Sequence, residues 1–156
     1  QQTSLECFVA KRYERRTYHG KRMRKLVPLI PSLIFVRGRK SEIQQIKQKY
    51  QYLQYVGSAL SEERFKVLTV PDKQMTDFIK IAGEYEADIQ YLSPVEVALA
   101  KGSRVRILGG VFDGVEGVLL YDKEKNSSRV VVSLPESLGS ISTAEISPDL
   151  LEVIEE

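Results

Sequence analysis

The spacing of glycines in residues 101–120, KGSRVRILGGVFDGVEGVLL, constrains the fold of this chain more than any other feature. This stretch holds five of the ten glycines, set within an alternation of apolar and charged residues that is typical of strands. Glycine at this density serves where the backbone needs a positive φ or where two backbones approach closely. After Gly117 the chain continues as an apolar strand and not as a helix, so a dinucleotide-binding fingerprint does not fit. The stretch therefore predicts a β-hairpin with glycine-shaped turns.

The net charge of +2 conceals a strong asymmetry along the chain. Residues 1–40 carry 11 Lys/Arg and 2 Asp/Glu, a net of +9, whereas the remainder carries 12 and 19, a net of −7. A front end this basic indicates contact with nucleic acid or with an acidic protein surface. A solvated hairpin that is merely basic is the alternative interpretation.

The few cysteines and histidines narrow the chemistry that the chain could perform. The single cysteine, Cys7, excludes an internal disulfide and indicates a reducing compartment, the cytoplasm. The single histidine, His19, excludes a multi-histidine metal site and falls on a predicted loop, so Cys7 is expected to be a small core residue and not a nucleophile. No apolar run approaches the ~18 residues of a membrane span, and no signal peptide opens the sequence. We expect no membrane partner.

A basic ribbon is predicted within residues 12–25, as two strand ends joined by a turn at His19-Gly20. It projects too many charges to be buried, so it should stand out from its domain as an arm. Its tyrosines could stack on unpaired bases or could simply pack across the hairpin. Its candidate phosphate contacts, which would give affinity without base specificity, are Arg15, Arg16, Lys21, Arg22 and Arg24.

An apolar segment, LVPLIPSLIFVR, follows the arm from Leu26 to Arg37. Pro28 and Pro31 cannot lie inside a central strand, so the strand is predicted to begin near Ser32 and to be buried from Leu33 to Val36. The apolar residues before it could stay exposed as a protein-binding patch. Plain core is the alternative interpretation.

Two helices are predicted in the front part of the chain. The first covers residues 41–51 with Ser41 as its N-cap, because apolar residues recur there at helical spacing. The second opens at Pro71-Asp72, with Asp72 or Thr69 as its cap, and ends at Gly83.

The helical period is lost over residues 84–94, which end at Ser93-Pro94, so we expect a linker there. Short strands separated by turns follow and are typical of a small barrel. The predicted class is α+β, with a front domain at residues 1–83 and a barrel at residues 95–156. The strands expected in the second domain are 95–99, 104–108, 115–121, 129–134, 140–146 and 151–154.

The glycine-rich stretch resembles the KOW motif, which occurs in ribosomal proteins and in the NusG family of transcription elongation factors. The match consists of Gly102 before the first strand, then Gly110-x-Phe112-x-Gly114-x-x-Gly117 and an apolar strand. The basic hairpin followed by LIPSLIFV resembles the NusG N-terminal (NGN) domain, and VPDKQMTDFI resembles the start of the helix that closes that domain. The stretches ECFVAKRYERR, GVFDGVEGVLL and ISTAEI are most similar to the UpxY paralogues of Bacteroides capsule operons.

This resemblance implies an NGN α/β sandwich followed by a small SH3-like KOW β-barrel. The NGN domain of the family begins with a strand and a helix that nothing before Gln1 supplies, so the front domain is expected to be incomplete and to expose a sheet edge. The family's aromatic residue in its PGY-like motif is replaced in Pro31-Ser32-Leu33.

The resemblance also implies a function without catalysis and without a cofactor. The NGN domain would bind the clamp helices of the largest RNA polymerase subunit, and the basic hairpin would lie towards upstream DNA or nascent RNA. The barrel would recruit Rho or a small-subunit ribosomal protein, and the outcome would be antitermination of one operon, of the capsular polysaccharide type. The polymerase-binding positions that match are Ile30, Pro31, Leu33 and Phe35, and those of the KOW turn are Gly110, Phe112, Gly114 and Gly117.

Two other functions compete with this hypothesis. A structural RNA-binding protein of the ribosomal KOW class would be basic throughout, whereas residues 101–156 carry 6 Lys/Arg and 10 Asp/Glu, a net of −4. A small hydrolase would need a nucleophile and a base within reach. Asp113 and Glu116 lie close in sequence, but no metal-spaced cluster accompanies them, and a solvated turn is the simpler interpretation.

Overall fold

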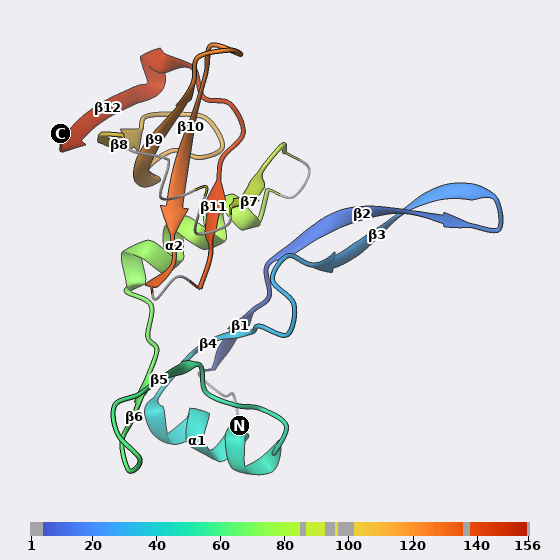
Figure 1. Cartoon of the computed structure of the whole chain (residues 1–156), viewed down its shortest axis with the longest axis vertical. Coiled ribbons are helices and arrows are strands. Elements are labelled where there is room, and N and C mark those ends of the chain that lie inside the picture. The colour runs from blue at the N-terminus through green and yellow to red at the C-terminus, as the bar shows by residue number, and fades with distance from the viewer. Residues whose placement is uncertain (1–4, 85–86, 93–95, 97–101, 136–137, 156) are drawn as a thin grey trace.

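The computed structural model describes residues 5–84, 87–92, 96, 102–135 and 138–155, which form an α+β structure of antiparallel sheets and two α-helices. A six-stranded sheet with α2 beside it occupies one end, and α1 with short two-stranded sheets occupies the other (Figure 1). The elements are β1 (Glu6–Phe8), β2 (Lys11–Tyr18), β3 (Lys21–Pro28), β4 (Phe35–Arg37), α1 (Lys40–Lys49), β5 (Gly57–Ala59), β6 (Phe65–Val67), α2 (Asp72–Ala82), β7 (Gln90–Leu92), β8 (Arg104–Ile107), β9 (Glu116–Asp122), β10 (Ser127–Ser133), β11 (Ser140–Ser142), a 3₁₀ turn (Pro148–Leu150) and β12 (Leu151–Glu155).

The six-stranded sheet has the order β12-β8-β9-β10-β11-β7, and every neighbouring pair is antiparallel. Its strands confirm the β pattern predicted after the linker, although β11 is shorter than the expected strand at 140–146. The apolar residues of the alternation point to one side and are buried, as β8 shows with its buried Val105 and Ile107. This face supplies most of the core of the molecule.

The glycine-rich stretch forms the predicted hairpin of β8 and β9. Gly110 and Gly114 adopt positive φ angles of 73° and 85° in the connecting turn. Gly117 instead lies where a Cβ would collide with the backbone carbonyl oxygen of Val131 on β10. The two uses of glycine, turn conformation and close strand approach, are both present in this hairpin.

A strand, β7, lies within residues 84–94, where the sequence predicts a linker. It pairs with β11, from Ser140 opposite Leu92 to Ser142 opposite Gln90, and it buries Leu92. Three residues are too few for a periodicity to be detected from sequence. The strand predicted at 95–99 falls, apart from residue 96, outside the described residues.

Both predicted helices are present, but the predicted side-chain caps are wrong. Helix α1 starts one residue earlier than expected, with Arg39 as N-cap, so Ser41 is already helical. Helix α2 has Pro71 as N-cap, so neither Asp72 nor Thr69 caps it, and it ends at Gly83 as predicted. In each helix the carbonyl oxygen of the N-cap residue accepts the first helical hydrogen bond, while no side chain caps the free N–H groups.

The strand expected to be buried from Leu33 to Val36 is shorter and more exposed than predicted. Ser32 adopts a positive φ of 59°, and the strand β4 begins only at Phe35. Val36 is exposed, and Leu33 and Phe35 are half-buried. The physical reason is that β4 pairs only with β1 among the described strands, so no wider sheet covers it.

Helix α2 connects the two ends of the molecule through one continuous core. Its Phe78 and Ile81 are fully buried. On one side the ring of Phe78 meets the rings of Phe8 and Phe35, at centroid distances of 6.4 and 5.5 Å. On the other side the helix packs on β10 and β11. The sheet and the front of the chain are therefore not independent in this structure.

Candidate functional site

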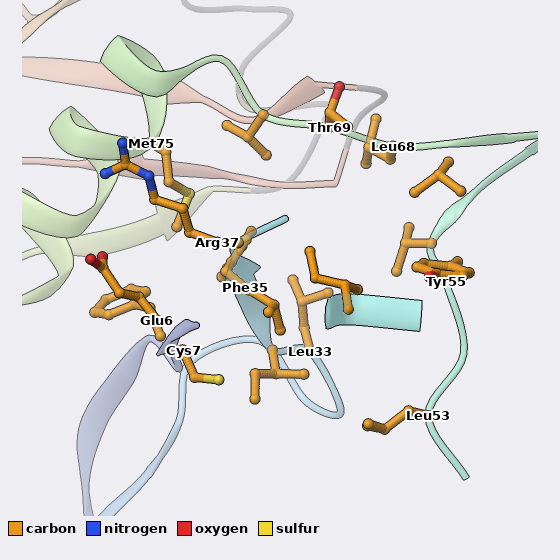
Figure 2. Close-up of a pocket in the computed structure, with 18 of the residues that line it drawn as sticks. Glu6, Cys7, Leu33, Phe35, Arg37, Leu53, Tyr55, Leu68, Thr69 and Met75 are labelled. Carbon is orange, nitrogen blue, oxygen red and sulfur yellow. The ribbon is translucent and has the colours of Figure 1, made fainter. Parts of the chain in front are cut away.

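An apolar groove opens at the end of the molecule that carries α1 and the short sheets. It has a volume of about 650 Å³ and is lined from β1, β4, α1, α2 and the segments at 53–56 and 67–70. Figure 2 shows Cys7 and Leu33 below Phe35, with Tyr55 to the right and Leu68 above. Cys7 is exposed here and is not the core residue that the sequence predicts. Because the lining is mainly aliphatic and aromatic, this groove suits an apolar protein surface better than a polar small molecule.

Two of the four predicted polymerase-binding residues line the groove. Leu33 and Phe35 do so, whereas Ile30 packs half-buried against the core and Pro31 is exposed outside the groove. The segment at 29–31 therefore does not form one patch with the strand that follows it.

Other residues of the groove were missed by the sequence analysis. Ile34, just before β4, and Val36 on β4 line the groove and are exposed. The apolar side of α1 also lines it, through Ile43 and Ile46. The helical spacing of Ile43 and Ile46 is visible in the sequence, but the same spacing is expected of a helix that packs on a core. No described residue of α1 is buried, so its apolar side borders open space.

The basic arm is the two-stranded ribbon of β2 and β3, as the sequence predicts. Neither strand pairs with any other described strand, and the ribbon projects away from the rest of the molecule (Figure 1). His19 and Gly20 form its turn with φ angles of 48° and 76°, as two-residue hairpin turns require. The ribbon carries all five predicted phosphate contacts on exposed positions: Arg15, Arg16, Lys21, Arg22 and Arg24.

The turn between β8 and β9, which we call the glycine turn, is held in place by two of its own side chains. Phe112 is buried and belongs to the core, so its ring anchors the turn. The backbone N–H of Gly109 donates to Asp113 Oδ1 at 2.7 Å. Leu108 and Val111 are exposed apolar residues of the segment between β8 and β9, and neither belongs to the predicted set of Gly110, Phe112, Gly114 and Gly117.

Helix α2 holds this same turn through polar contacts that the sequence analysis missed. Lys73 Nζ donates to the carbonyl oxygen of Gly114 at 2.8 Å, and Lys80 Nζ donates to that of Asp113. Asp77 is only 3% exposed, and its Oδ2 accepts the backbone N–H of Glu116 at 3.2 Å while its Oδ1 accepts Lys73 at 2.8 Å. The spacing of Lys73 and Asp77 is visible in the sequence, but the backbone groups that they bind lie about forty residues further along the chain.

Asp113 and Glu116 do not form a carboxylate pair. Asp113 is engaged by the Gly109 amide, and Glu116 accepts two hydrogen bonds from Arg106, at 2.6 and 2.9 Å. The hydrogen bond with Arg106 lowers the pKa of Glu116 below its ordinary value of 4.5, and the same contact raises the pKa of Arg106. Within the described residues no group of three or more His, Cys, Asp or Glu side chains is placed to hold a metal ion.

The comparisons with known proteins leave the family open: no protein-family model, no curated protein and no solved structure matches this chain. Among the residues that the structure describes, neither helix has the length and apolar character needed to span a bilayer.

Proposed function

We propose that this chain is a NusG-like transcription elongation and antitermination factor of the UpxY type. In this proposal the front of the chain corresponds to an NGN domain and the six-stranded sheet to a KOW barrel. The observation that carries the proposal is an apolar groove lined in part by β1 and β4, together with a basic arm whose two strands lie between β1 and β4 in the chain. An elongation factor needs both features, since it must bind a protein surface while it lies beside nucleic acid.

The polymerase partner would enter the groove as a helical element. Clamp helices present apolar side chains along one helix face, and a groove lined by Leu33, Ile34 and Phe35 can accept such a face. A factor that binds the elongating polymerase better than the paused polymerase shifts the population towards elongation. No acid, base or metal is required for this mechanism.

A KOW partner such as Rho or a ribosomal protein would have to use the exposed surface of the sheet. Phe112 is buried, and the backbone carbonyls of Asp113 and Gly114 are already engaged by α2. Leu108 and Val111 are exposed apolar side chains of the segment between β8 and β9 that such a partner could contact.

A structural RNA-binding protein of the ribosomal class is the alternative. Its binding would depend on the arm alone, because Arg37 and Lys47 are the only cations among the described residues that line the groove. The two functions therefore differ in whether the groove is needed.

The experiment is capture of purified RNA polymerase by the tagged protein. Leu33→Asp combined with Ile34→Asp places two charges in the groove and is expected to reduce capture at least about tenfold, because a buried unpaired charge is costly. Leu60→Asp is the matched control, since Leu60 is 64% exposed and does not line the groove. Undiminished capture by the groove double variant, with its thermal unfolding unchanged, would overturn the proposal.

A further inference from the structure

The hairpin of β5 and β6 borders the groove and exposes apolar side chains beyond it. It lies at the end of the molecule that carries α1, and it pairs with no other described strand (Figure 1). Its exposed apolar residues, with the residue just before β5 included, are Val56, Leu60, Phe65 and Val67. Val56 and Val67 line the groove, whereas Leu60 and Phe65 do not. Single exposed apolar residues are ordinary, but apolar surface that continues from one element to the next marks a protein-binding site.

The register of the hairpin places Phe65 on a face that continues the groove. Gly57 lies opposite Val67, and Ala59 lies opposite Phe65. Opposed residues share a face, and so do residues two apart along a strand, so these four lie together on what we call the Phe65 face. None of the four has a polar side chain. The apolar surface therefore runs without interruption from Val67 in the wall of the groove to Phe65.

The ring of Phe65 leans towards the groove end of the hairpin. A Cβ on Gly57 would lie 3.0 Å from the ring atom Cζ of Phe65, although Phe65 is paired with Ala59. The ring therefore reaches back along the face towards Gly57 and its partner Val67. Phe65 is nevertheless 52% exposed, so a large part of this residue is open to a partner.

The opposite face of the hairpin is interrupted by a polar pair. This face also begins at the groove, where the backbone N–H of Leu68 donates to the carbonyl oxygen of Val56 at 2.7 Å. Ser58 and Lys66 follow as an opposed pair, and Leu60 comes only after them. Leu60 is thus separated from the groove by polar side chains, and it offers an internal comparison for Phe65.

The turn of the hairpin is closed by hydrogen bonds. The backbone N–H of Leu60 donates to the carbonyl oxygen of Arg64 at 2.9 Å, and the backbone N–H of Arg64 donates to Ser61 Oγ at 3.1 Å. A hairpin that is already ordered loses little conformational entropy when a partner covers it. Phe65 is therefore presented at a defined position next to the groove.

The spacing along the Phe65 face suits a helical partner. Phe65 and Val67 are two residues apart, which corresponds to about 7 Å along a strand. Successive turns of an α-helix are separated by about 5.4 Å. A helix that lies in the groove and continues over the hairpin can therefore place the side chains of one turn on Val67 and those of the next turn near Phe65.

We propose that the Phe65 face is a second part of the polymerase-binding site, and that Phe65 contacts the helical turn next to the one held in the groove. This inference rests on the proposed function. It adds a contact residue outside the groove and a requirement on the partner, whose helix must carry apolar side chains on at least two successive turns. Leu60 on the opposite face takes no part.

The test measures the affinity of the full chain for purified RNA polymerase, with Phe65→Ala and Leu60→Ala as a matched pair. Each variant removes an exposed apolar side chain from the same hairpin, so thermal unfolding should be unchanged in both. Phe65→Ala should weaken binding about tenfold or more, because a few apolar anchors carry most of the binding free energy of an interface. Leu60→Ala should weaken it less than about twofold. Phe65→Leu keeps an apolar side chain and should retain most of the affinity.

A second matched pair adds a side chain and leaves Phe65 in place. Ala59→Arg puts a long cation opposite Phe65, whereas Ser58→Arg puts the same cation on the other face. Ala59→Arg should weaken binding about tenfold or more, because the cation would be buried without a partner in the complex. Ser58→Arg should change the affinity less than about threefold.

Equal affinities within each matched pair would overturn the assignment of the face, and so would a greater loss in Leu60→Ala than in Phe65→Ala. The groove variant Leu33→Asp with Ile34→Asp separates this inference from the proposed function. If that variant loses binding while Phe65→Ala and Ala59→Arg bind normally, the function stands and the inference about the hairpin is overturned. If the unmodified chain does not bind the polymerase, the proposed function is overturned, and this inference with it.

Discussion

The six-stranded sheet and the front region, residues 5–70, bury their apolar side chains to different extents. In the sheet Val105, Ile107, Val130 and Ile141 are fully buried. In the described part of the front region only Ala10 and Leu29 reach the buried class, and apolar side chains of β4 and α1 line an open groove instead. Burial of apolar area is the main source of folding free energy. The sheet is therefore expected to supply most of the stability, whereas the front region keeps apolar surface that a partner can cover.

The largest expected change in the free energy of unfolding comes from truncating a buried side chain of the sheet, and it is compared with the same truncation in the groove of the front region. Ile107→Ala in the sheet should lower the free energy of unfolding by about 2–5 kcal/mol, since a cavity forms in a packed core. Ile34→Ala in the groove should change it by less than about 0.5 kcal/mol, since Ile34 is 43% exposed. Urea unfolding measures both values. Comparable losses would mean that the groove is part of the structural core.

A smaller loss of stability is expected from removing a hydrogen bond between α2 and the sheet. Asp77→Ala should cost about 1–3 kcal/mol, because the backbone N–H of Glu116 loses its acceptor in a nearly buried position. It should also speed hydrogen exchange at the Glu116 amide, which isolates this contact from general loosening. Asp72→Ala is the control, as this exposed carboxylate in the first turn of α2 makes no contact with the sheet through any described hydrogen bond. A Glu116 amide that exchanges at the same rate in both variants would contradict the role of Asp77.

The smallest expected effect is a dependence of the stability on pH, which arises from an ion pair between two strands of the sheet. The pKa of Glu116 is lower in the folded state than its ordinary value of 4.5, so the ion pair with Arg106 stabilises the fold above that value. Its contribution should disappear as the pH falls through the lowered pKa, because protonation then favours the unfolded state. Glu116→Gln should therefore be less stable than the unmodified chain at neutral pH and equally stable at strongly acidic pH. A difference that persists unchanged into acid would show that Glu116 acts through packing instead.

The sheet was more predictable from sequence than the front region because its signals are local. The alternation in Arg104–Ile107 and the glycines at 110, 114 and 117 each fix a backbone conformation without reference to distant residues. The same holds for the turn at His19-Gly20 in the arm. Helix ends were less predictable, because a backbone start at Arg39 or Pro71 needs no side-chain cap.

The groove and the hydrogen bonds from α2 to the glycine turn could not be predicted, because both depend on contacts between residues that are far apart in the sequence. Leu33 and Ile43 have the same apolar character whether a neighbouring strand covers them or not. Lys73 and Asp77 appear in the sequence as an ordinary pair one helical turn apart, yet they bind Gly114 and Glu116.

The most direct test of the central proposal is site-specific crosslinking in a transcription elongation complex. A photo-reactive amino acid replaces Ile34 in the groove or Leu60 outside it, and the crosslinked polymerase subunit is identified by mass spectrometry. We expect a crosslink from position 34 to the clamp helices of the largest subunit and none from position 60. Equal crosslinking from both positions, or none from position 34 in a complex that retains the protein, would contradict the groove as the polymerase-binding site.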